Sequence, residues 1–385
     1  MKTVDRSVVA FFWRGVIVSL TRPTHAWDFA RTVARQAAAA RRRRAWRKQG
    51  VQVPPIIIFS VTHRCNLACA GCYAQSFRGG GSAEGCTAQI VPGISAAIPG
   101  GEAATDEGSE LSDAKLRSIV AEAAELGVSF FVIAGGEPLM REELLVVAER
   151  FPQIVFLVFT NGTLLDEPMV ERVAQLRNLV PLISLEGTED QTDGRRGEGT
   201  YQQLRKAMDR LDRKRQFFGC SLTLTSRNFD DIFSEGYIDG LADAGCRFFL
   251  FLDYTPVDPN TEEWVLTASQ RDQVETRMED LRRRHRALFV AVPWDESEVG
   301  GCLSAGRGFV HINASGEVEP CPFAPYSDVH LKEVSLREAL SSPFLSRLRD
   351  MPELLEYEGG GCELWKNREE VERVLAEVQS RDCEV

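Results

Sequence analysis

From residue 55 onward, short apolar segments alternate with segments of helical periodicity, and this alternation strongly constrains the fold. The strand-like segments are 55–61, 128–134, 154–160, 180–185, 219–225 and 246–252. The first helical segment begins at Ser112, buries one apolar face and stops at Gly127. Strands that alternate with helices are typical of βα units and a parallel sheet. The sequence therefore predicts an α/β fold built from six βα units.

The remaining helical segments and one long interruption complete this outline. Helices are expected at about 141–151, 167–176, 200–216 and 230–244, and Thr267-x-x-Gln270 is a capping box for a further helix to about residue 286. Residues 76–110 are rich in Gly, Ala and Ser and also contain Cys86. We interpret them as a mobile loop, since structureless connections of this length are usually functional or disordered.

Three cysteines, Cys65, Cys69 and Cys72, follow the first predicted strand. A [4Fe–4S] cluster normally takes four cysteine ligands, so three would leave one iron open to a ligand that is not protein. Zinc is the alternative, but closed zinc sites use four ligands, usually in pairs, and no second pair lies nearby. Disulfides are not needed in a chain of 385 residues.

The spacing C-x3-C-x2-C resembles the signature of the radical S-adenosylmethionine (SAM) superfamily. The resemblance implies a partial (β/α)6 barrel in which Cys65, Cys69 and Cys72 bind a [4Fe–4S] cluster. It also implies that SAM binds the open iron and is cleaved reductively to a 5′-deoxyadenosyl radical. Cys86 would then be a spare thiol, a further ligand or a radical relay.

Several predicted strand ends carry motifs that resemble the SAM-binding positions of this family, and chemistry gathers at such ends in parallel barrels. The resemblance implies that Gly135, Gly136, Glu137 and Pro138 hold the SAM amino group, that Asn161, Ser184 and Glu186 contact the ribose and methionine, and that Arg227 binds the carboxylate. Tyr73 completes the set, whereas Gly71 stands where many members carry an aromatic residue. The alternative for Asn161, Ser184 and Glu186 is ordinary turn chemistry.

A second group, Cys302, Cys321 and Cys362, lies in the last third of the chain. Two short strands are expected around the turn 313–316, and this hairpin could bring Cys302 and Cys321 together. The arrangement resembles the SPASM/twitch extension, which binds auxiliary Fe–S clusters. Ala324 stands where relatives often have another cysteine, which favours a single twitch-like cluster.

The fourth ligand of this auxiliary cluster is left open: the candidates are Cys383, His330 and Asp328, or the substrate itself. The alternative is a domain that has lost its cluster and retains buried cysteines. Cys220 and Cys246 lie in apolar strands and are interpreted as core packing.

Residues 1–50 form a basic head, with twelve Lys and Arg against two Asp, whereas the whole chain has a formal charge of −11. The acidic body argues against nucleic-acid binding. The apolar stretch 8–20 is too short to span a bilayer and lacks a secretory cleavage site. The head, with an Arg-rich helix at about 26–48, is either an interfacial segment attracted to anionic lipid or an extension packed on the catalytic domain. We expect a cytoplasmic protein with peripheral contact at the inner membrane face.

These inferences predict a basic extension (1–50), a radical SAM core (51–295) and an α+β auxiliary-cluster domain (296–385). The expected function is that of a radical SAM oxidoreductase or transferase, which abstracts hydrogen from a peptide or lipid-like substrate. A reducing partner such as ferredoxin or flavodoxin is implied. The alternative is a non-catalytic iron–sulfur electron carrier or metal-binding protein, and the apparent SAM-binding motifs argue against it.

Overall fold

The computed structural model of the chain describes Arg14, Gly15, Val18 and residues 23–76, 110–297, 299–357 and 361–382. Most of the predicted loop 76–110, with Cys86, lies outside the described residues. The same is true of Cys383 and of most of the apolar stretch at the start of the chain.

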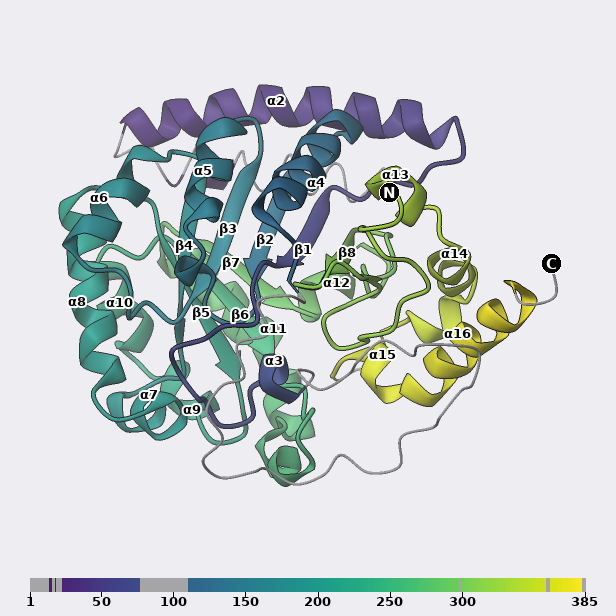
Figure 1. The fold of residues 1–385 in the computed structure, drawn as a ribbon. Coiled ribbons are helices and arrows are strands. Elements are labelled where there is room, and N and C mark those ends of the chain that lie inside the picture. Colours follow the sequence, from purple (N-terminus) through teal and green to yellow (C-terminus); the bar gives the residue numbers. More distant parts are fainter. Residues whose placement is uncertain are drawn as a thin grey trace.

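One nine-stranded sheet, in the order β7-β6-β5-β4-β3-β2-β1-β8-β9, organises the molecule and does not close (Figure 1). The strands are β1 (Ile56–Ser60), β2 (Phe130–Ala134), β3 (Val155–Thr160), β4 (Leu179–Leu185), β5 (Gly219–Leu224), β6 (Phe248–Asp253), β7 (Leu288–Val292), β8 (Phe309–Ile312) and β9 (Val318–Glu319). All neighbours pair in parallel except β8 and β9. The six predicted strands are confirmed to within two residues, while β7 was not predicted.

Helices cover the outer face of the sheet (Figure 1). They are α4 (Asp113–Leu126), α5 (Glu143–Arg150), α6 (Glu167–Gln175), α8 (Thr200–Arg213), α10 (Tyr237–Asp243) and α11 (Ala268–Arg284), whereas the short helices α7 (Glu189–Arg196), α9 (Phe229–Ile232) and α12 (Trp294–Ser297) follow the ends of β4, β5 and β7. The predicted ends of α4 are confirmed, because the Ser112 side chain accepts a hydrogen bond from Lys115 N and Gly127 adopts φ 97°. The single helix expected over 230–244 is wrong: the chain forms α9 and α10, separated by Gly236 at φ 91°.

The C-terminal segment continues the sheet of the barrel. Its β8 pairs with β1, and the predicted hairpin is confirmed by the antiparallel pairing of β8 with β9. A buried chain of hydrogen bonds adds to this junction: Ser60 Oγ lies 2.8 Å from His311 Nε2, and His311 Nδ1 lies 2.6 Å from Glu319 Oε2. The short helices α13 (Leu336–Ala339), α14 (Pro343–Arg349) and α15 (Glu363–Lys366) and the longer α16 (Arg368–Asp382) follow. The proposed boundary at residue 295 stays a prediction.

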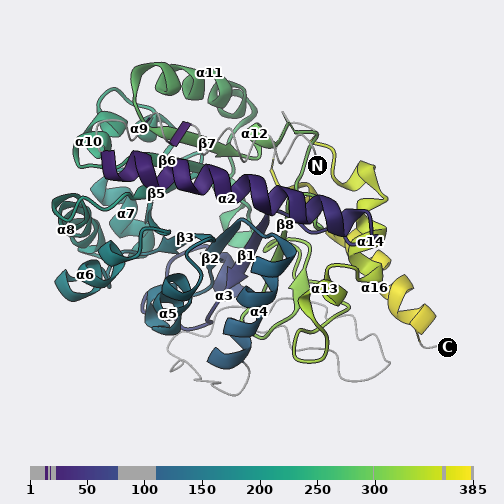
Figure 2. The same cartoon turned by 90° about the horizontal axis from the view of Figure 1, so that it is seen from above.

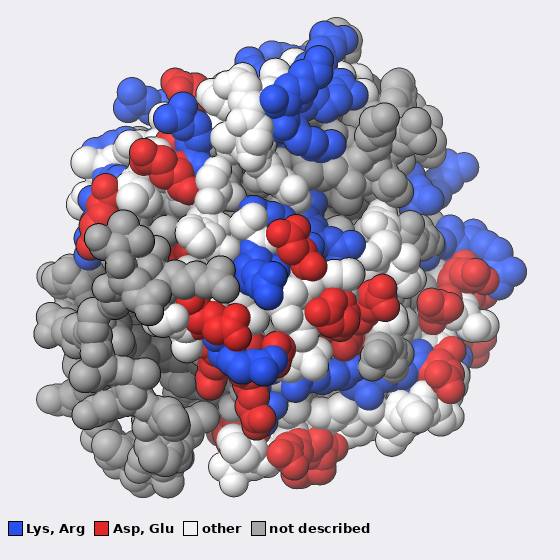
Figure 3. Space-filling model, turned by 90° about the vertical axis from the view of Figure 1, so that its right-hand side faces the viewer, with Lys and Arg blue, Asp and Glu red and all other residues white. Residues whose placement is uncertain are grey.

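The predicted Arg-rich helix is α2 (Pro23–Arg47), which crosses the amino-terminal ends of the strands (Figures 1 and 2). The side chain of Arg43 is buried there and donates a hydrogen bond of 2.8 Å to Ser129 Oγ. Arg31, Arg41 and Arg44 stay exposed, and Figure 3 shows basic side chains gathered at this end of the molecule. Over the described part of the chain, no helix is both long and apolar enough to cross a bilayer. The extension therefore packs on the barrel while part of its basic face remains in solvent.

Candidate active site

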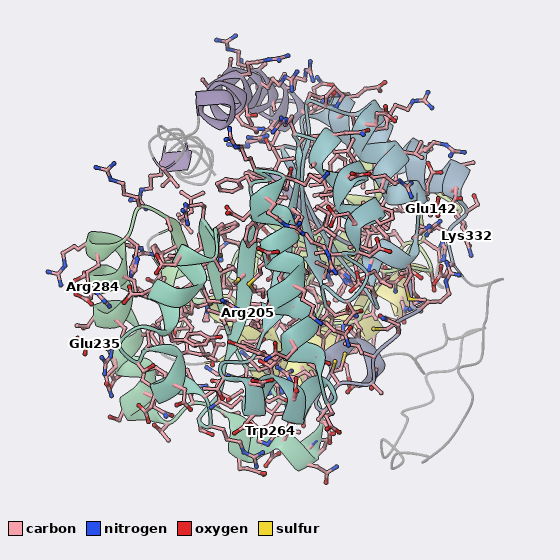
Figure 4. All side chains as sticks on the ribbon, turned by 90° about the vertical axis from the view of Figure 1, so that its left-hand side faces the viewer. Glu142, Arg205, Glu235, Trp264, Arg284 and Lys332 are labelled. Atoms are coloured by element: carbon pink, nitrogen blue, oxygen red, sulfur yellow. The ribbon has the colours of Figure 1, made fainter. Side chains whose placement is uncertain are left out.

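A cavity of about 1260 Å³ occupies the inside of the barrel. Both predicted cysteine groups line it: Cys65, Cys69 and Cys72 from the loop after β1, and Cys302, Cys321 and Cys362 from the C-terminal segment. The first group lies at the end of the barrel near Trp264, and Figure 4 shows this end on the opposite side of the molecule from α2. The two groups, more than 200 residues apart in sequence, therefore face one shared space.

The first cysteine loop is held against the end of β2 by two backbone hydrogen bonds. Gly136 N donates to Thr62 O at 2.8 Å, and Glu137 N donates to Arg64 O at 2.8 Å. A Cβ added at Gly136 would lie 2.0 Å from Arg64 O, and Gly135 adopts φ 121°. Both glycines line the cavity. They are needed because the chain that carries Cys65 approaches the backbone here too closely for a side chain.

Glu137 is 1% exposed and does not line the cavity. Its carboxylate accepts hydrogen bonds from Leu139 N (3.0 Å), Thr160 Oγ1 (2.8 Å) and Asn161 N (2.7 Å). Burial raises the pKa of Glu137, and these three donors partly oppose that shift. The side chain thus joins the ends of β2 and β3. Pro138, buried at the start of the 3₁₀ turn η2 (Pro138–Met140), also lies outside the cavity lining.

Asn161 and Ser184 do line the cavity, at the ends of β3 and β4. The amide nitrogen Nδ2 of Asn161 lies 2.8 Å from Asn66 Oδ1 and 4.0 Å from Cys65 Sγ. Asn161 therefore contacts the first cysteine loop, and Ser184 lines the same cavity.

Glu186 binds two arginines instead of facing the cavity. Its side chain is 3% exposed, and its oxygens accept from Arg195 Nη1 at 2.5 Å and from Arg196 Nε at 2.9 Å. Burial alone would raise the pKa of Glu186, but the two guanidinium groups hold it below its ordinary value. Arg195 also donates to Ala70 O at 3.1 Å, within the first cysteine loop.

Arg195 and Arg196 are the cationic groups that line the cavity beside the first cysteine loop, and we did not identify them in the sequence. The sequence does carry a signal for them, because two adjacent arginines follow the predicted strand 180–185, on the side of the sheet where the carboxyl ends of the strands lie. Arg227, which we did select, is exposed, pairs with Glu263 at 2.8 Å and does not line the cavity. The guanidinium carbon of Arg227 lies 4.9 Å from the ring centre of Trp264.

Position 71 has a structural requirement for glycine. It adopts φ 62°, and a Cβ there would lie 2.4 Å from the Tyr254 hydroxyl oxygen. Tyr73 lines the cavity, and its ring lies 5.5 Å from that of Phe323, edge to face. Because Phe323 lies close after Cys321, this aromatic contact connects the two cysteine groups.

The second group is more deeply buried. The Cys321 and Cys362 thiols lie side by side, and Cys302 Sγ lies 3.2 Å from Ser304 Oγ. Burial raises the pKa of the Cys302 thiol, and the nearby Glu296 carboxylate raises it further. Glu296 is 9% exposed and lines the same part of the cavity.

Two of the predicted fourth ligands lie elsewhere. Asp328 accepts a hydrogen bond from Phe344 N at 3.0 Å, at the start of α14, and His330 Nδ1 accepts one from Lys332 N at 3.0 Å. Neither residue lines the cavity. Cys220 and Cys246 are fully buried among apolar side chains, which confirms their assignment to core packing.

Asp253, at the end of β6, connects the barrel to the second cysteine group. Its Oδ2 accepts from Gly361 N at 3.0 Å and from Arg271 Nε at 3.2 Å. Since Gly361 precedes Cys362, this carboxylate fixes the position of that cysteine relative to the barrel. Asp253 Oδ1 is buried without a hydrogen-bond partner, and the residue lines the cavity.

The donor sets suit iron–sulfur clusters, which are held by cysteine thiolates. All six cysteines are free thiols that line one cavity. Among the described residues, no three His, Cys, Asp or Glu side chains gather around a point that could hold one metal ion.

The profile of the Radical SAM superfamily matches residues 59–232. The AdoMet-dependent heme synthase of Methanosarcina barkeri is 26% identical over 343 residues, covering 81% of this chain and 89% of that protein. The mycofactocin maturase MftC of Mycobacterium tuberculosis is 26% identical over 294 residues, covering 72% and 66%. The crystal structure of Streptococcus suis SuiB bound to its precursor peptide SuiA superposes with a TM-score of 0.58 at 17% identity, covering 85% and 71%.

Proposed function

We propose that this chain is a radical SAM enzyme, with a [4Fe–4S] cluster and SAM as its cofactors, and that Cys65, Cys69 and Cys72 hold the cluster. When bound there, the reduced cluster would supply one electron to cleave SAM, giving a radical able to abstract hydrogen from carbon. The observation that carries the proposal is that this loop, Arg195, Arg196 and the second cysteine group line one cavity.

The lining side chains have distinct roles in this proposal. Arg195 and Arg196 would attract the SAM carboxylate, a role that Arg227 cannot fill from the exposed surface. Asn161 and Ser184 carry amide and hydroxyl groups that can hydrogen-bond a ribose. Glu137 and Glu186 act as positioning residues, because each carboxylate is occupied by buried protein donors.

Replacement of Cys65 by alanine tests the function. After anaerobic reconstitution with iron and sulfide, the unmodified chain should release 5′-deoxyadenosine from SAM in the presence of a strong reductant, and Cys65→Ala should not. The matched control is Cys220→Ala, which removes a buried thiol outside the cavity. Release by the unmodified chain no greater than by Cys65→Ala would instead favour the non-catalytic electron carrier.

We propose a single auxiliary cluster on Cys302, Cys321 and Cys362, with Glu296 as the carboxylate that completes it. Glu296 lines the same pocket as these thiols, whereas Asp328 and His330 do not. A cluster closed by protein in this way would pass electrons, since none of its irons would be left for substrate.

The auxiliary site is best tested with Cys65, Cys69 and Cys72 all replaced by alanine. We expect about four irons per chain to remain. In this background Glu296→Gln should change the g-values of the reduced cluster, because an amide is a weaker ligand than a carboxylate. Asp328→Asn is the control and should leave the spectrum unchanged. Identical spectra for the two variants would remove Glu296 from the ligand set, and absence of iron would remove the cluster.

Relatives support more than one kind of substrate. SuiB is solved with a precursor peptide, while the relative from M. barkeri is named as a heme synthase. Peptide and lipid-like substrates both remain compatible with hydrogen abstraction in this cavity, together with a donor such as ferredoxin or flavodoxin. The exposed arginines of α2 support our proposal of peripheral contact with an anionic membrane from the cytoplasmic side.

A further inference from the structure

The cavity extends along the whole length of the barrel strands. Its lining includes the first residues of four strands, Ile56, Phe130, Phe248 and Leu288, as well as residues at the opposite ends, where the cysteines lie. Five residues of strand at 3.3 Å each correspond to a lumen of about 16 Å. The space therefore continues from the first cysteine loop towards the end that α2 crosses.

This lumen is hollow and almost entirely apolar away from the cysteine end. Its lining there consists of Ile56, Ile58, Phe130, Val132, Leu157, Phe159, Phe248, Leu250, Leu252, Leu288, Val290 and Val292. In β2, β3 and β7 the inward-facing Val132, Leu157 and Val290 are only partly buried, although their outward-facing neighbours are fully buried. Parallel barrels normally fill this space with side chains. An apolar space left open along the barrel axis suits an elongated apolar ligand.

Cationic side chains line the cavity at the opening beside α11 and β7. They are Arg282 and Arg286, with Arg14 from the N-terminal segment, and His285 lies beside them in the lining. Arg282 is neutralised by Asp295 at 2.8 Å, and His285 lies 3.1 Å from Asp239. Arg286 is exposed and has no acidic partner among the described residues. Positive charge at the mouth of an apolar channel is complementary to a molecule with an anionic head and an apolar tail.

We propose that the substrate is an amphiphile whose linear apolar chain occupies the barrel lumen and whose anionic head group lies at Arg286. The chain then extends towards Cys65, Cys69 and Cys72, and its far end is the part that reaches the site of hydrogen abstraction. The statement about hydrogen abstraction rests on the proposed function, whereas the binding of the apolar chain does not depend on it. A folded or extended peptide, by contrast, would bring backbone amides into a lumen that offers few hydrogen-bond partners.

Binding is tested on the full chain without SAM or reductant, by displacement of a fluorescent undecanoic acid with unlabelled alkyl carboxylates and alkyl phosphates of eight to eighteen carbons. Affinity should rise about threefold to fourfold with each methylene, and then level off when the lumen is full. Comparison of carboxylates with phosphates identifies the head group. A rise of less than twofold in total over the series, or displacement by an apolar peptide but by no alkyl chain, would overturn the proposal.

Two variants locate the ligand. Val132→Phe should fill the lumen and weaken every long chain by at least about tenfold, whereas Val146→Phe, the same change at an exposed site, should have no effect. Arg286→Glu should weaken alkyl phosphates about fivefold or more but leave alkanols of equal length unchanged. Equal weakening of phosphates and alkanols, or full affinity in Val132→Phe, would overturn it. Release of 5′-deoxyadenosine by the unmodified chain is measured separately, so failure of chain binding and failure of the proposed function are distinguishable.

Discussion

Replacing Glu186 with alanine is expected to lower the free energy of unfolding by roughly 3–5 kcal/mol. The carboxylate is 3% exposed, and its partners Arg195 and Arg196 are 15% and 12% exposed. Removal of the acid leaves two guanidinium groups largely buried without their counter-charge, which costs more than the net contribution of the ion pairs themselves. Chemical denaturation monitored by circular dichroism measures the difference.

The matched control is Glu263→Ala, which removes the acid from an ion pair with Arg227 whose side chains are 65% and 57% exposed. Solvent screens that pair, so the expected loss is below about 1 kcal/mol. Glu186→Gln should fall between the two, because the amide can still accept hydrogen bonds but carries no charge. A loss for Glu186→Ala as small as that for Glu263→Ala would show that the buried network contributes little.

Glu186→Ala should also weaken iron binding, because Arg195, one of the two partners of Glu186, is hydrogen-bonded to the first cysteine loop. The loop and the helix are joined by hydrogen bonds in both directions: Ala70 N donates to Arg195 O at 3.0 Å, and Arg195 Nε donates to Ala70 O at 3.1 Å. An arginine released from Glu186 no longer holds this geometry. Iron content after reconstitution is therefore a second readout of the same change.

The fold was largely predictable because its signal is local. Apolar runs, the Ser112 cap and the stop at Gly127 each depend on residues close in sequence, and they determined the strands and α4. Strand β7 was not predicted because its five residues are separated from α11 by only three residues and are followed by α12, a helix of a single turn with little helical signal in the sequence. The split between α9 and α10 depends on a single glycine at positive φ, Gly236, within an otherwise helical pattern.

The cysteines were predictable from spacing, but the directions of side chains at strand ends were not. Arg227 follows β5 as expected, yet Asn228 shapes the turn by accepting from Thr225 N at 2.7 Å and donating to Glu186 O at 2.9 Å. This turn leaves Arg227 on the surface. Likewise Glu186 was selected as a ligand contact, but the helix that follows it supplies two buried arginines. Whether a side chain at a strand end faces the cavity or another residue depends on contacts between neighbouring βα units, and the spacing of residues in the sequence does not reveal those contacts.

Replacing Gly136 with alanine should displace the first cysteine loop and remove its cluster. The new Cβ would lie 2.0 Å from the oxygen and 2.5 Å from the carbon of the Arg64 carbonyl, and backbone cannot rotate away as a side chain can. Because Arg64 precedes Cys65, the loop must move to make room. We expect iron after reconstitution to fall from about eight to about four per chain, with release of 5′-deoxyadenosine lost and stability lowered by roughly 1–3 kcal/mol.

Gly240→Ala separates this effect from a general intolerance of alanine. Gly240 lies inside α10, and a Cβ there would meet no atom within 4 Å. That variant should keep its iron and gain up to about 1 kcal/mol of stability, because alanine is the better helix former. If Gly136→Ala retained both iron and activity, the close contact between the Gly-Gly turn and the Cys65 loop would have to be relieved without moving the cluster ligands. The paired glycines would then owe their presence to contact with the bound cofactor rather than to the approach of the two backbones.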